Sequence, residues 1–237
     1  MTIAGKTILV TGANRGIGRA LVEEALGRGA ARVYAGTRRP LTHPDERVVP
    51  LTLDVTDAGQ IRDAVTAAES VDVLVNNAGL SVYDDLSDRA ALERLLEVNL
   101  YGTHGVTSAF VPALTRSRGA VVNILSITAW APIPVIPAYS ISKAAAFSLS
   151  QSLRALLAGA GVRVHAVMTG PVDTDMSRAL DIPKASPESV AHAIFDGVEK
   201  GDDEIFPDPV SDAMAESWRG GAAKALERQY AGLVQPG

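Results

Sequence analysis

Hydrophobic residues along the chain gather in short runs that alternate with longer, amphipathic stretches. Several of the short runs are apolar at every position, which is typical of parallel strands buried on both faces. The predicted strands are Thr7–Val10, Arg32–Gly36, Val48–Leu53, Val71–Val75, Ala120–Leu125, Val162–Met168 and a short Glu204–Phe206. The predicted helices are Ile17–Arg28, Ala58–Ala68, Ala90–Arg116, Ala138–Ala158, Pro187–Lys200 and Met214–Leu233, the last interrupted at Gly220-Gly221.

Regular alternation of strands and helices predicts an α/β fold with right-handed crossovers. We expect a doubly wound parallel sheet of about seven strands in a three-layer α/β/α arrangement. No repeat or linker divides the sequence, so residues 1–237 are predicted to form one domain. Weak periodicity predicts a long loop over Thr169–Lys184, with a substrate lid near 172–185, and a helical C-terminal extension near 210–234.

Composition excludes several classes of function. The formal net charge of -5 argues against a general nucleic-acid-binding protein, although it allows a local basic pocket for one anionic cofactor. The absence of cysteine excludes disulfides, thiolate metal sites and cysteine nucleophiles. No run has the roughly 18 apolar residues that a membrane span needs, and the N-terminus does not have the pattern of a signal peptide. We therefore expect a cytoplasmic protein that binds no membrane.

A glycine-rich turn directly follows the first predicted strand and begins the first helix. Its sequence is Thr11-Gly12-Ala13-Asn14-Arg15-Gly16-Ile17-Gly18. Gly12 permits a sharp turn, Gly16 permits close approach of a pyrophosphate, and Gly18 permits close packing of the helix on the strand. The helix N-terminus adds unpaired N–H groups. This pattern indicates a phosphate cradle, and the alternative is a glycine turn that binds nothing.

Arginines follow the second predicted strand at the position where an NAD site would carry an acid. The sequence there is Thr37-Arg38-Arg39, and Arg15 is expected close by. Guanidinium groups bind a phosphate through charge-assisted hydrogen bonds, so this corner favours the 2′-phosphate of NADP(H). The alternative is that Arg38 and Arg39 are ordinary solvated loop charges.

Tyr139 and Lys143 stand four residues apart in a predicted helix and therefore share one face. A nearby ammonium stabilises phenolate and lowers the pKa of a tyrosine, which brings it into range as an acid or base. Ser126, at the end of a predicted strand, could donate a hydrogen bond to a carbonyl oxygen beside Tyr139. A surface tyrosine with a helix-spaced lysine is the alternative.

These motifs together resemble the short-chain dehydrogenase/reductase family, single-domain branch, over most of the chain. The matching elements, in order, are Thr11-Gly12-x3-Gly16-Ile17-Gly18, Asp54-Val55, Asn76-Asn77-Ala78-Gly79, Asn99, Ser126, Tyr139-x3-Lys143 and Thr169–Thr174. The resemblance implies a Rossmann-like fold, and a homodimer or homotetramer formed through Leu100–Arg116 and Ala138–Ala158. The family usually has Pro-Gly where this chain has Thr169-Gly170, so we expect a locally altered entry to the lid.

The resemblance also implies catalytic roles. Tyr139 would exchange a proton with the substrate oxygen, and Ser126 would position that oxygen. Lys143 would lower the Tyr139 pKa and hold the nicotinamide ribose, while Asn99 would hold a water that relays protons to Lys143. Asn76 is expected to be structural. The implied cofactor-binding residues are Gly12, Asn14, Arg15, Gly16, Ile17, Gly18, Thr37, Arg38, Asp54, Val55, Asn77, Ala78, Gly79, Tyr139, Lys143, Gly170, Val172 and Thr174.

Apolar residues dominate the segments expected near the substrate. The predicted pocket residues are Tyr83, Thr128, Trp130, Ile133, Met176 and Leu180, and Arg178 is the one basic candidate in the lid segment Asp175–Ile182. We therefore predict a neutral, largely hydrophobic ketone or aldehyde, or the matching secondary alcohol, as the substrate of an NADPH-dependent reductase. The four histidines have no metal-ligand spacing, so no metal is expected.

Three other functions remain open at this stage. They are an NAD-linked alcohol dehydrogenase, a non-catalytic dinucleotide-binding sensor, and an epimerase or dehydratase of the extended branch. The joint presence of Ser126, Tyr139 and Lys143 disfavours the sensor. The lack of a C-terminal substrate domain disfavours the epimerase or dehydratase.

Overall fold

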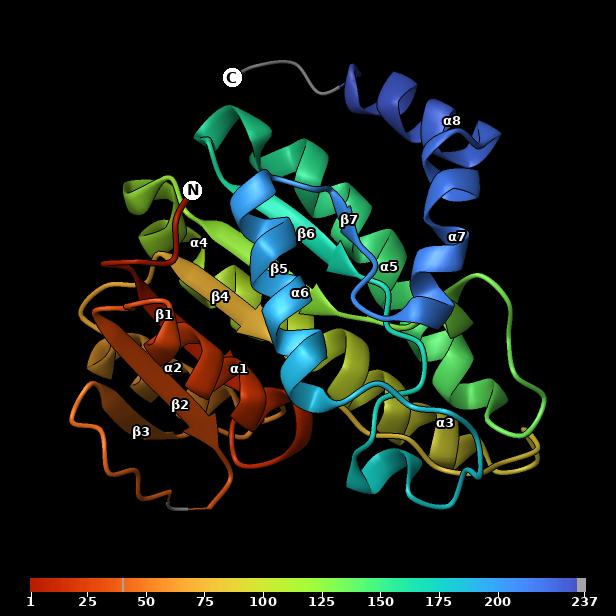
Figure 1. Cartoon of the computed structure of the whole chain (residues 1–237), viewed down its shortest axis with the longest axis horizontal. Helices are drawn as coiled ribbons and strands as arrows, with labels where there is room; N and C mark the ends of the chain where they lie inside the picture. The colour runs from red at the N-terminus through yellow and green to blue at the C-terminus, as the bar shows by residue number, and fades with distance from the viewer. Residues whose placement is uncertain (40, 234–237) are drawn as a thin grey trace.

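The computed structural model describes residues 1–39 and 41–233. Its centre is an all-parallel sheet of seven strands in the order β3-β2-β1-β4-β5-β6-β7 (Figure 1). The strands are β1 Thr7–Thr11, β2 Arg32–Thr37, β3 Val48–Thr52, β4 Val73–Asn76, β5 Ala120–Ile124, β6 Arg163–Val167 and β7 Glu204–Ile205. The strand order changes direction between β1 and β4, which confirms the predicted doubly wound sheet.

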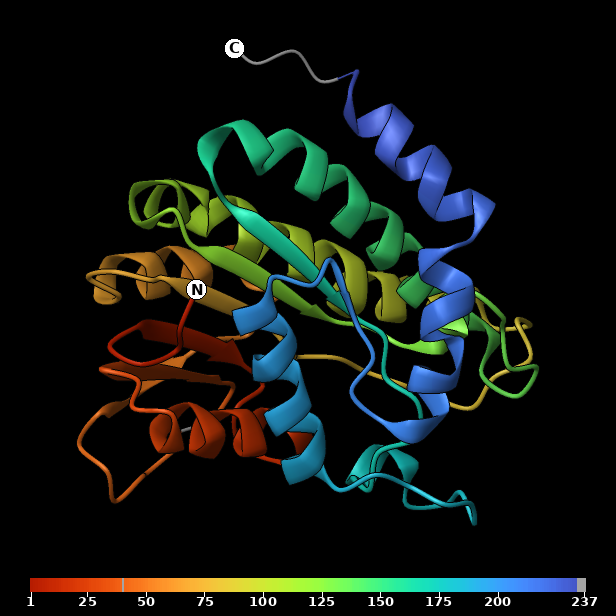
Figure 2. The same cartoon turned by 45° about the horizontal axis from the view of Figure 1, so that its top comes forward.

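Helices cover both faces of the sheet. Figures 1 and 2 show α1 (Gly16–Gly27) and α6 (Pro187–Lys200) on one face, and α2 (Ala58–Ala67), α4 (Thr103–Ser117) and α5 (Pro137–Leu157) on the other. This arrangement confirms the three-layer prediction.

Alternate side chains of each strand enter opposite layers of the core. In β1, Ile8 and Val10 pack in the cluster under α1 and α6, whereas Leu9 packs in the cluster under α2 and α4. All three side chains are fully buried. Because both faces of the strand are covered, it needs apolar residues at successive positions, which is the pattern seen in the sequence.

The long helix predicted over Ala90–Arg116 differs from the structure at its centre. Helix α3 (Arg89–Leu96) continues into a π-helical segment, Glu97–Gly102, before α4 begins. Within that segment, Asn99 bonds the backbone of Leu80, 19 residues away. A π-helical turn is rare and common at functional sites, and here it turns Asn99 toward a distant loop that local periodicity does not reveal.

Two helices form the C-terminal part, and they separate at Gly220-Gly221 as predicted. Helix α7 (Pro209–Arg219) begins five residues before the predicted Met214, so that predicted boundary is wrong. Asp208 explains the earlier start, because its side chain accepts hydrogen bonds from the first turn. Helix α8 (Ala222–Ala231) follows. Residue 234, the last of the predicted extension, lies outside the described residues.

Buried charges attach α8 to the edge of the sheet. The Lys224 side chain is 2% exposed, and its Nζ lies 3.0 Å from carboxylate oxygens of Asp203 and Glu204 and 3.1 Å from Glu227. Arg154 of α5 also pairs with Glu204 and Glu227. Two cations and three carboxylates therefore share one network, which offsets the cost of removing each charge from water.

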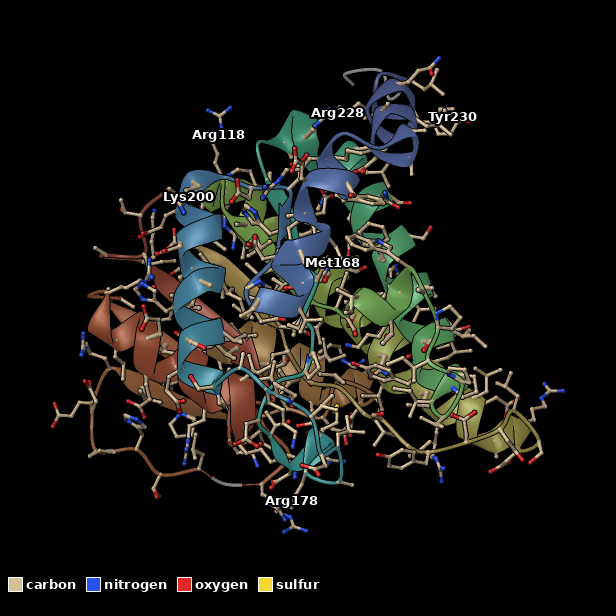
Figure 3. The ribbon with its side chains drawn as sticks, turned by 45° about the vertical axis from the view of Figure 1, so that its right-hand side comes forward. Arg118, Met168, Arg178, Lys200, Arg228 and Tyr230 are labelled. Atoms are coloured by element: carbon tan, nitrogen blue, oxygen red, sulfur yellow. The ribbon has the colours of Figure 1, made fainter. Side chains whose placement is uncertain are left out.

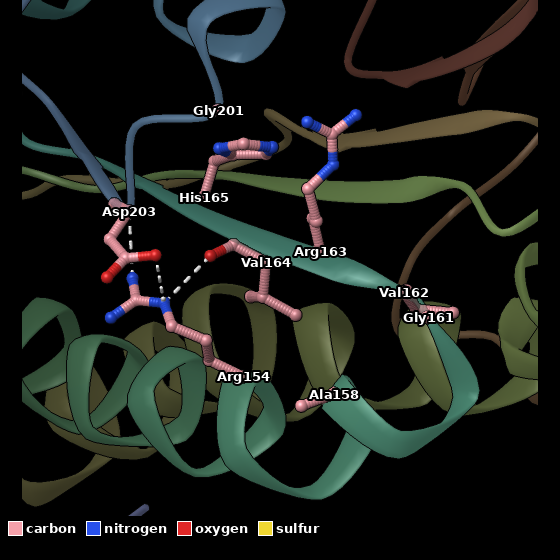
Figure 4. A pocket seen from close by; sticks show the side chains of 9 residues that line it. All are labelled: Arg154, Ala158, Gly161, Val162, Arg163, Val164, His165, Gly201 and Asp203. Carbon is pink, nitrogen blue, oxygen red and sulfur yellow. Dashed lines mark hydrogen bonds and ion pairs between the residues drawn. The ribbon is translucent and has the colours of Figure 1, made fainter. Parts of the chain in front are cut away.

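A pocket of about 240 Å³ lies beside the first residues of β6, which the two-residue strand β7 does not pair with (Figure 4). Arg154 crosses this gap and donates from Nε to the backbone oxygen of Val164 at 3.0 Å, in place of a neighbouring strand. Arg163 and His165 also line it. The pocket lies at the amino end of β6, away from the loops that follow the strands, so it is not the candidate reaction site.

His165 is 1% exposed within β6. Its Nδ1 lies 2.6 Å from the backbone oxygen of Asp202, and burial lowers the pKa of the imidazole to about 4. The ring is therefore neutral in the folded protein at neutral pH, and its Nε2 is buried without a hydrogen-bond partner. Among the described residues, no helix is long and apolar enough to span a bilayer.

We predict that His165 makes the protein sensitive to acid. Below the unfolded pKa of 6.5, the unfolded chain binds a proton that the folded chain refuses until about pH 4, so stability falls as pH falls through this window. Urea unfolding at about pH 7 and about pH 4.5 should differ by about 2–3 kcal/mol through this residue alone. The variant His165→Gln should lose that part of the difference. Equal pH dependence in both proteins would contradict the assignment.

Candidate active site

The predicted site residues lie in loops at the carboxyl ends of the parallel strands. The glycine turn follows β1, Asn77-Ala78-Gly79 follows β4, and Ser126 follows β5. Helix α5 begins nearby and carries Tyr139 and Lys143. The strand order reverses between β1 and β4, and ligands of open α/β sheets bind at such a position.

The glycine turn has the geometry that its sequence predicts. Gly12 and Gly16 have φ values of 67° and 51°, which a side chain disfavours. A Cβ built on Gly18 would lie 2.2 Å from the backbone oxygen of Gly12, so only glycine fits there. Arg15 is the N-cap of α1 and makes no capping hydrogen bond through its side chain. The first N–H groups of α1 therefore remain available to an anion.

Thr11 and Asn77 join the glycine turn to the chain after β4. Thr11 Oγ1 accepts hydrogen bonds from the backbone N–H groups of Asn77 and Ala78, each at 3.0 Å. Asn77 Nδ2 donates to the backbone oxygens of Thr11 and Gly12. These bonds hold Ala78 and Gly79 beside the phosphate cradle. Asn76 is structural, as expected, since its amide bonds Thr107 and Asn123 in the core.

The basic corner lies where β2 ends. Thr37 is buried, and Arg38 and Arg39 are exposed. Arg15 is also exposed, and its guanidinium lies 3.1 Å from the carboxylate of Asp175 in the lid. The corner thus presents accessible guanidinium groups, as a site for a phosphate requires.

Asp54 and Val55, for which the family resemblance implies contacts with the adenine of the cofactor, follow β3. Asp54 Oδ1 accepts hydrogen bonds from the N–H and hydroxyl of Thr56. Val55 is buried against Gly102 of the π-helical segment, where a Cβ would lie 2.6 Å from Val55 Cγ2. Their adenine contacts stay a prediction.

Lys143 and Tyr139 share one face of α5, as their spacing predicts. Lys143 Nζ donates to the backbone oxygen of Ile124 at 2.8 Å and lies 5.6 Å from the centre of the Tyr139 ring. Ser126 lies close enough to Tyr139 to lower the pKa of its phenol, and Ser126 Oγ accepts a hydrogen bond from Thr128 N at 3.2 Å. The structure therefore brings Ser126, Tyr139 and Lys143 together at the end of β5.

Burial sets the protonation of this group. It raises the pKa of Tyr139 to about 12, against a smaller lowering by the Ser126 hydrogen bond, and it lowers the pKa of Lys143 to about 8. The sequence-based expectation was a Tyr139 pKa lowered by Lys143. That expectation is wrong, because the loss of hydration raises the Tyr139 pKa in the structure, and Tyr139 is therefore a protonated phenol at neutral pH.

The backbone at Gly79 passes close to the side chains of both Asn99 and Lys143. Asn99 bonds both backbone groups of Leu80, and its Nδ2 also donates to Ser142 Oγ at 2.9 Å. A Cβ built on Gly79 would lie 3.4 Å from Asn99 Oδ1 and 3.7 Å from Lys143 Nζ. The water-holding role of Asn99 stays a prediction.

The predicted lid is closed at its base by backbone hydrogen bonds. Asp173 N donates to Ala185 O at 2.8 Å, and Ala185 N donates to Pro171 O at 3.0 Å. Val172 is buried, and Thr174 Cγ2 lies 3.1 Å from a Cβ built on Gly16. The base of the lid therefore lies against the glycine turn.

Gly170, which keeps the family's glycine after the departure at Thr169, is held by Asp208, a residue that the sequence motifs did not indicate. Its N–H donates to Asp208 Oδ2 at 2.7 Å, and a Cβ there would lie 2.4 Å from Asp208 Oδ1. Asp208 also caps α7, so the entry to the lid is fixed to the C-terminal part of the chain. The Asp-Pro pair at 208–209, a typical helix start, was the available signal.

Most of the predicted substrate residues have accessible apolar side chains. Tyr83 is 60% exposed, Met176 51%, Ile133 44% and Leu180 36%, whereas Thr128 is buried. Arg178 points outward from the lid and pairs with Asp175 (Figure 3).

Trp130 has a different environment from these residues. It stacks on Trp218 of α7 with ring centres 4.6 Å apart, and Phe147 and Phe206 pack around the pair. Its role toward substrate, like that of the other pocket residues, stays a prediction. The described residues contain no cluster of side chains that could hold a metal ion.

Comparisons with known proteins identify the family. The short chain dehydrogenase family model matches residues 6–184. An uncharacterized oxidoreductase of Staphylococcus saprophyticus is 32% identical over 207 residues, which cover 79% of this chain and 88% of that protein. The 2-(S)-hydroxypropyl-CoM dehydrogenase 3 of Xanthobacter autotrophicus is 33% identical over 210 residues, which cover 81% of this chain and 82% of that protein.

A solved structure agrees over nearly the whole chain. The crystal structure of a short chain dehydrogenase from Burkholderia cenocepacia, in complex with NADP, has a TM-score of 0.89 and 38% sequence identity, and the match covers 97% of this chain and 98% of that one. Sequence motifs, fold and comparisons agree, and the chain belongs to the short-chain dehydrogenase family of oxidoreductases.

Proposed function

We propose that the protein reduces a neutral, largely hydrophobic ketone or aldehyde with NADPH. The observation that carries this proposal is the group formed by Ser126, Tyr139 and Lys143 at the end of β5. A phenol that is protonated at neutral pH can act as a general acid, and the adjacent hydroxyl can orient the oxygen that receives the proton. The reverse reaction would oxidise the matching secondary alcohol.

The residues of the proposed nucleotide-binding crevice, at the carboxyl ends of β1, β2 and β4, fit NADP(H). The uncapped N-terminus of α1 suits the pyrophosphate, and Gly79 leads the chain past Asn99 and Lys143. Arg38 and Arg15 suit the 2′-phosphate. The phosphate would compete with Asp175 for the guanidinium of Arg15. The Burkholderia structure with NADP supports this choice. We propose that Val172 and Thr174 hold the nicotinamide end.

In the proposed reaction, the protein orients the substrate and moves one proton. When bound, the reduced nicotinamide supplies the hydride that forms the new C–H bond at the carbonyl carbon. Tyr139 gives its hydroxyl proton to the carbonyl oxygen, so the product is a neutral alcohol. The Lys143 ammonium stabilises the phenolate that remains, and its pKa of about 8 suits it to return the proton.

The accessible apolar side chains support a hydrophobic substrate. Tyr83, Ile133, Met176 and Leu180 come from three separate segments, and all keep more than a third of their surface exposed. The charge of Arg178 is paired with Asp175, so the lid offers no free cation to a carboxylate substrate at that position.

We also propose that the protein is a homodimer or homotetramer. The two helical segments expected at the contact, Leu100–Arg116 and Ala138–Ala158, carry the exposed side chains of Tyr101 and Ile141. Burial of such side chains between subunits would stabilise the assembly.

Replacing Tyr139 with Phe tests the catalytic role. We expect wild-type protein to consume NADPH with at least one compound in a screen of neutral ketones, aldehydes and quinones. The variant Tyr139→Phe should lose about 10²–10⁴-fold in kcat, because no proton donor remains, while the Kd of NADPH changes by less than about twofold. Full activity in the variant would remove Tyr139 from catalysis. Binding of NADPH without turnover of any compound would favour the sensor.

Replacing Arg38 with Asp tests the cofactor choice. The Kd of NADPH should rise at least about tenfold and that of NADH should change little, because only NADPH carries the 2′-phosphate. Arg228→Asp on α8 is the control, since it makes the same change of charge at an exposed position far from the crevice (Figure 3). An equal loss of affinity for both cofactors in Arg38→Asp would count against a phosphate-binding role.

The pH dependence of reduction tests Lys143. Its ammonium loses a proton as pH rises through about 8, whereas Tyr139 keeps its proton to about pH 12. With saturating NADPH, kcat for reduction should therefore be level below about pH 7 and fall above about pH 8. Thermal unfolding at each pH shows whether the protein remains folded. If kcat began to fall only above about pH 10, the result would contradict this assignment.

A further inference from the structure

We propose that Asp84 is a positioning residue for catalysis, because its carboxylate caps helix α5 and fixes the helical turn that carries Tyr139. The proposal rests on the proposed function, in which Tyr139 is the proton donor. Asp84 belongs to the loop after β4. Its carboxylate accepts a hydrogen bond from the N–H of Ala138, 54 residues later in the sequence. Its contacts run through backbone groups of α5 and the neighbouring loops.

Helix α5 lacks a cap of its own. Its N-cap residue is Ile136, which has no side-chain acceptor, and Pro137 has no N–H group. The first unpaired donor of the helix is therefore Ala138 N. Both carboxylate oxygens of Asp84 lie 3.3 Å from this atom.

Four other helices are capped from within their own sequence. Helices α2, α3, α6 and α7 begin at acceptors that bond their own first turns, namely Asp57, Asp88, Ser186 and Asp208. The helix that carries the catalytic residues instead depends on an acceptor from the loop that contains Tyr83. Capping of α5 is thus tied to the position of a loop at the predicted substrate pocket.

Asp84 also joins two loops in front of the site. Its N–H donates to the backbone oxygen of Val135 at 3.3 Å, and its Oδ1 accepts from Leu86 N at 3.1 Å. Leu86 has a φ of 66°, a left-handed conformation that is unfavourable for a leucine. The carboxylate therefore joins a strained turn to the start of the helix, and the backbone N–H of the same residue joins them to the loop before α5.

Ser140 makes a second connection directly after Tyr139. Its Oγ accepts from Ile133 N at 3.3 Å and donates to Ile136 O at 3.1 Å. Tyr139 thus lies between a turn held by Asp84 and a loop held by Ser140. A negative charge at a helix N-terminus is also favourable, so the carboxylate suits this position better than a neutral acceptor.

Two variants of Asp84 separate the hydrogen bond from the charge. Asp84→Ala removes both, and Asp84→Asn keeps an acceptor of the same size. Asp85→Ala is the control, because Asp85 is adjacent in sequence and its Oδ1 bonds within its own loop, to Ser87 N at 3.0 Å.

We expect Asp84→Ala to lower kcat about tenfold or more, while the Kd of NADPH stays within about twofold of wild type, because a small misplacement of a reacting group is costly. Asp84→Asn should retain kcat within about threefold. Hydrogen exchange of the NADPH-loaded protein should be faster at residues 136–140 in Asp84→Ala than in wild type or Asp85→Ala. This measurement reports on the helix start without depending on turnover.

Unchanged kcat or unchanged exchange in Asp84→Ala would overturn the proposal. A loss of NADPH affinity as large as the loss of kcat would also overturn it, because it would indicate a general structural defect. If Asp84→Ala does not fold, kcat and hydrogen exchange are measured in Asp84→Asn. Exchange at the wild-type rate with kcat within threefold of wild type supports the proposed cap. Faster exchange at residues 136–140 with kcat at the wild-type level overturns the proposal. The proposed function is judged separately, by NADPH consumption in wild type and its loss in Tyr139→Phe.

Discussion

The ammonium of Lys143 is the group on which the geometry of the site depends. It is buried, and it donates to the backbone oxygen of Ile124 at the end of β5. A buried charge needs a polar partner, so this bond fixes the distance between α5 and the sheet. Tyr139 is one turn earlier on the same helix, and Ser126 follows the same strand. One hydrogen bond between a helix and a strand thereby sets how Tyr139, the proposed proton donor, lies relative to Ser126.

Local sequence predicts much of this arrangement. Fully apolar runs such as Val73–Val75 indicate strands covered on both faces, and Pro187 after Ser186 marks the start of α6. The glycine turn was also predictable, because the backbone geometry at Gly12 and the close packing at Gly18 admit almost no other residue. In these places the physical requirement is met by residues close together in sequence.

The remaining features depend on contacts between distant segments. The π-helical turn at Asn99 is stabilised by Leu80, and the cap of α5 comes from Asp84. The protonation of Tyr139 depends on how much water the folded chain excludes, which spacing alone does not reveal. Local patterns therefore predicted the residues of the proposed reaction site, and tertiary contacts determine the environment of those residues.

The guanidinium of Arg154 has a consequence for how the protein behaves at high concentration. Strand β7 covers only the last part of β6, so the backbone of β6 near Val164 would otherwise be an open edge. Open edges recruit strands from other molecules and start aggregation. The Arg154 side chain is bonded to this buried carbonyl, so it blocks that pairing while keeping the backbone group satisfied. The part of β6 that the short last strand leaves uncovered is thus no template for fibril growth.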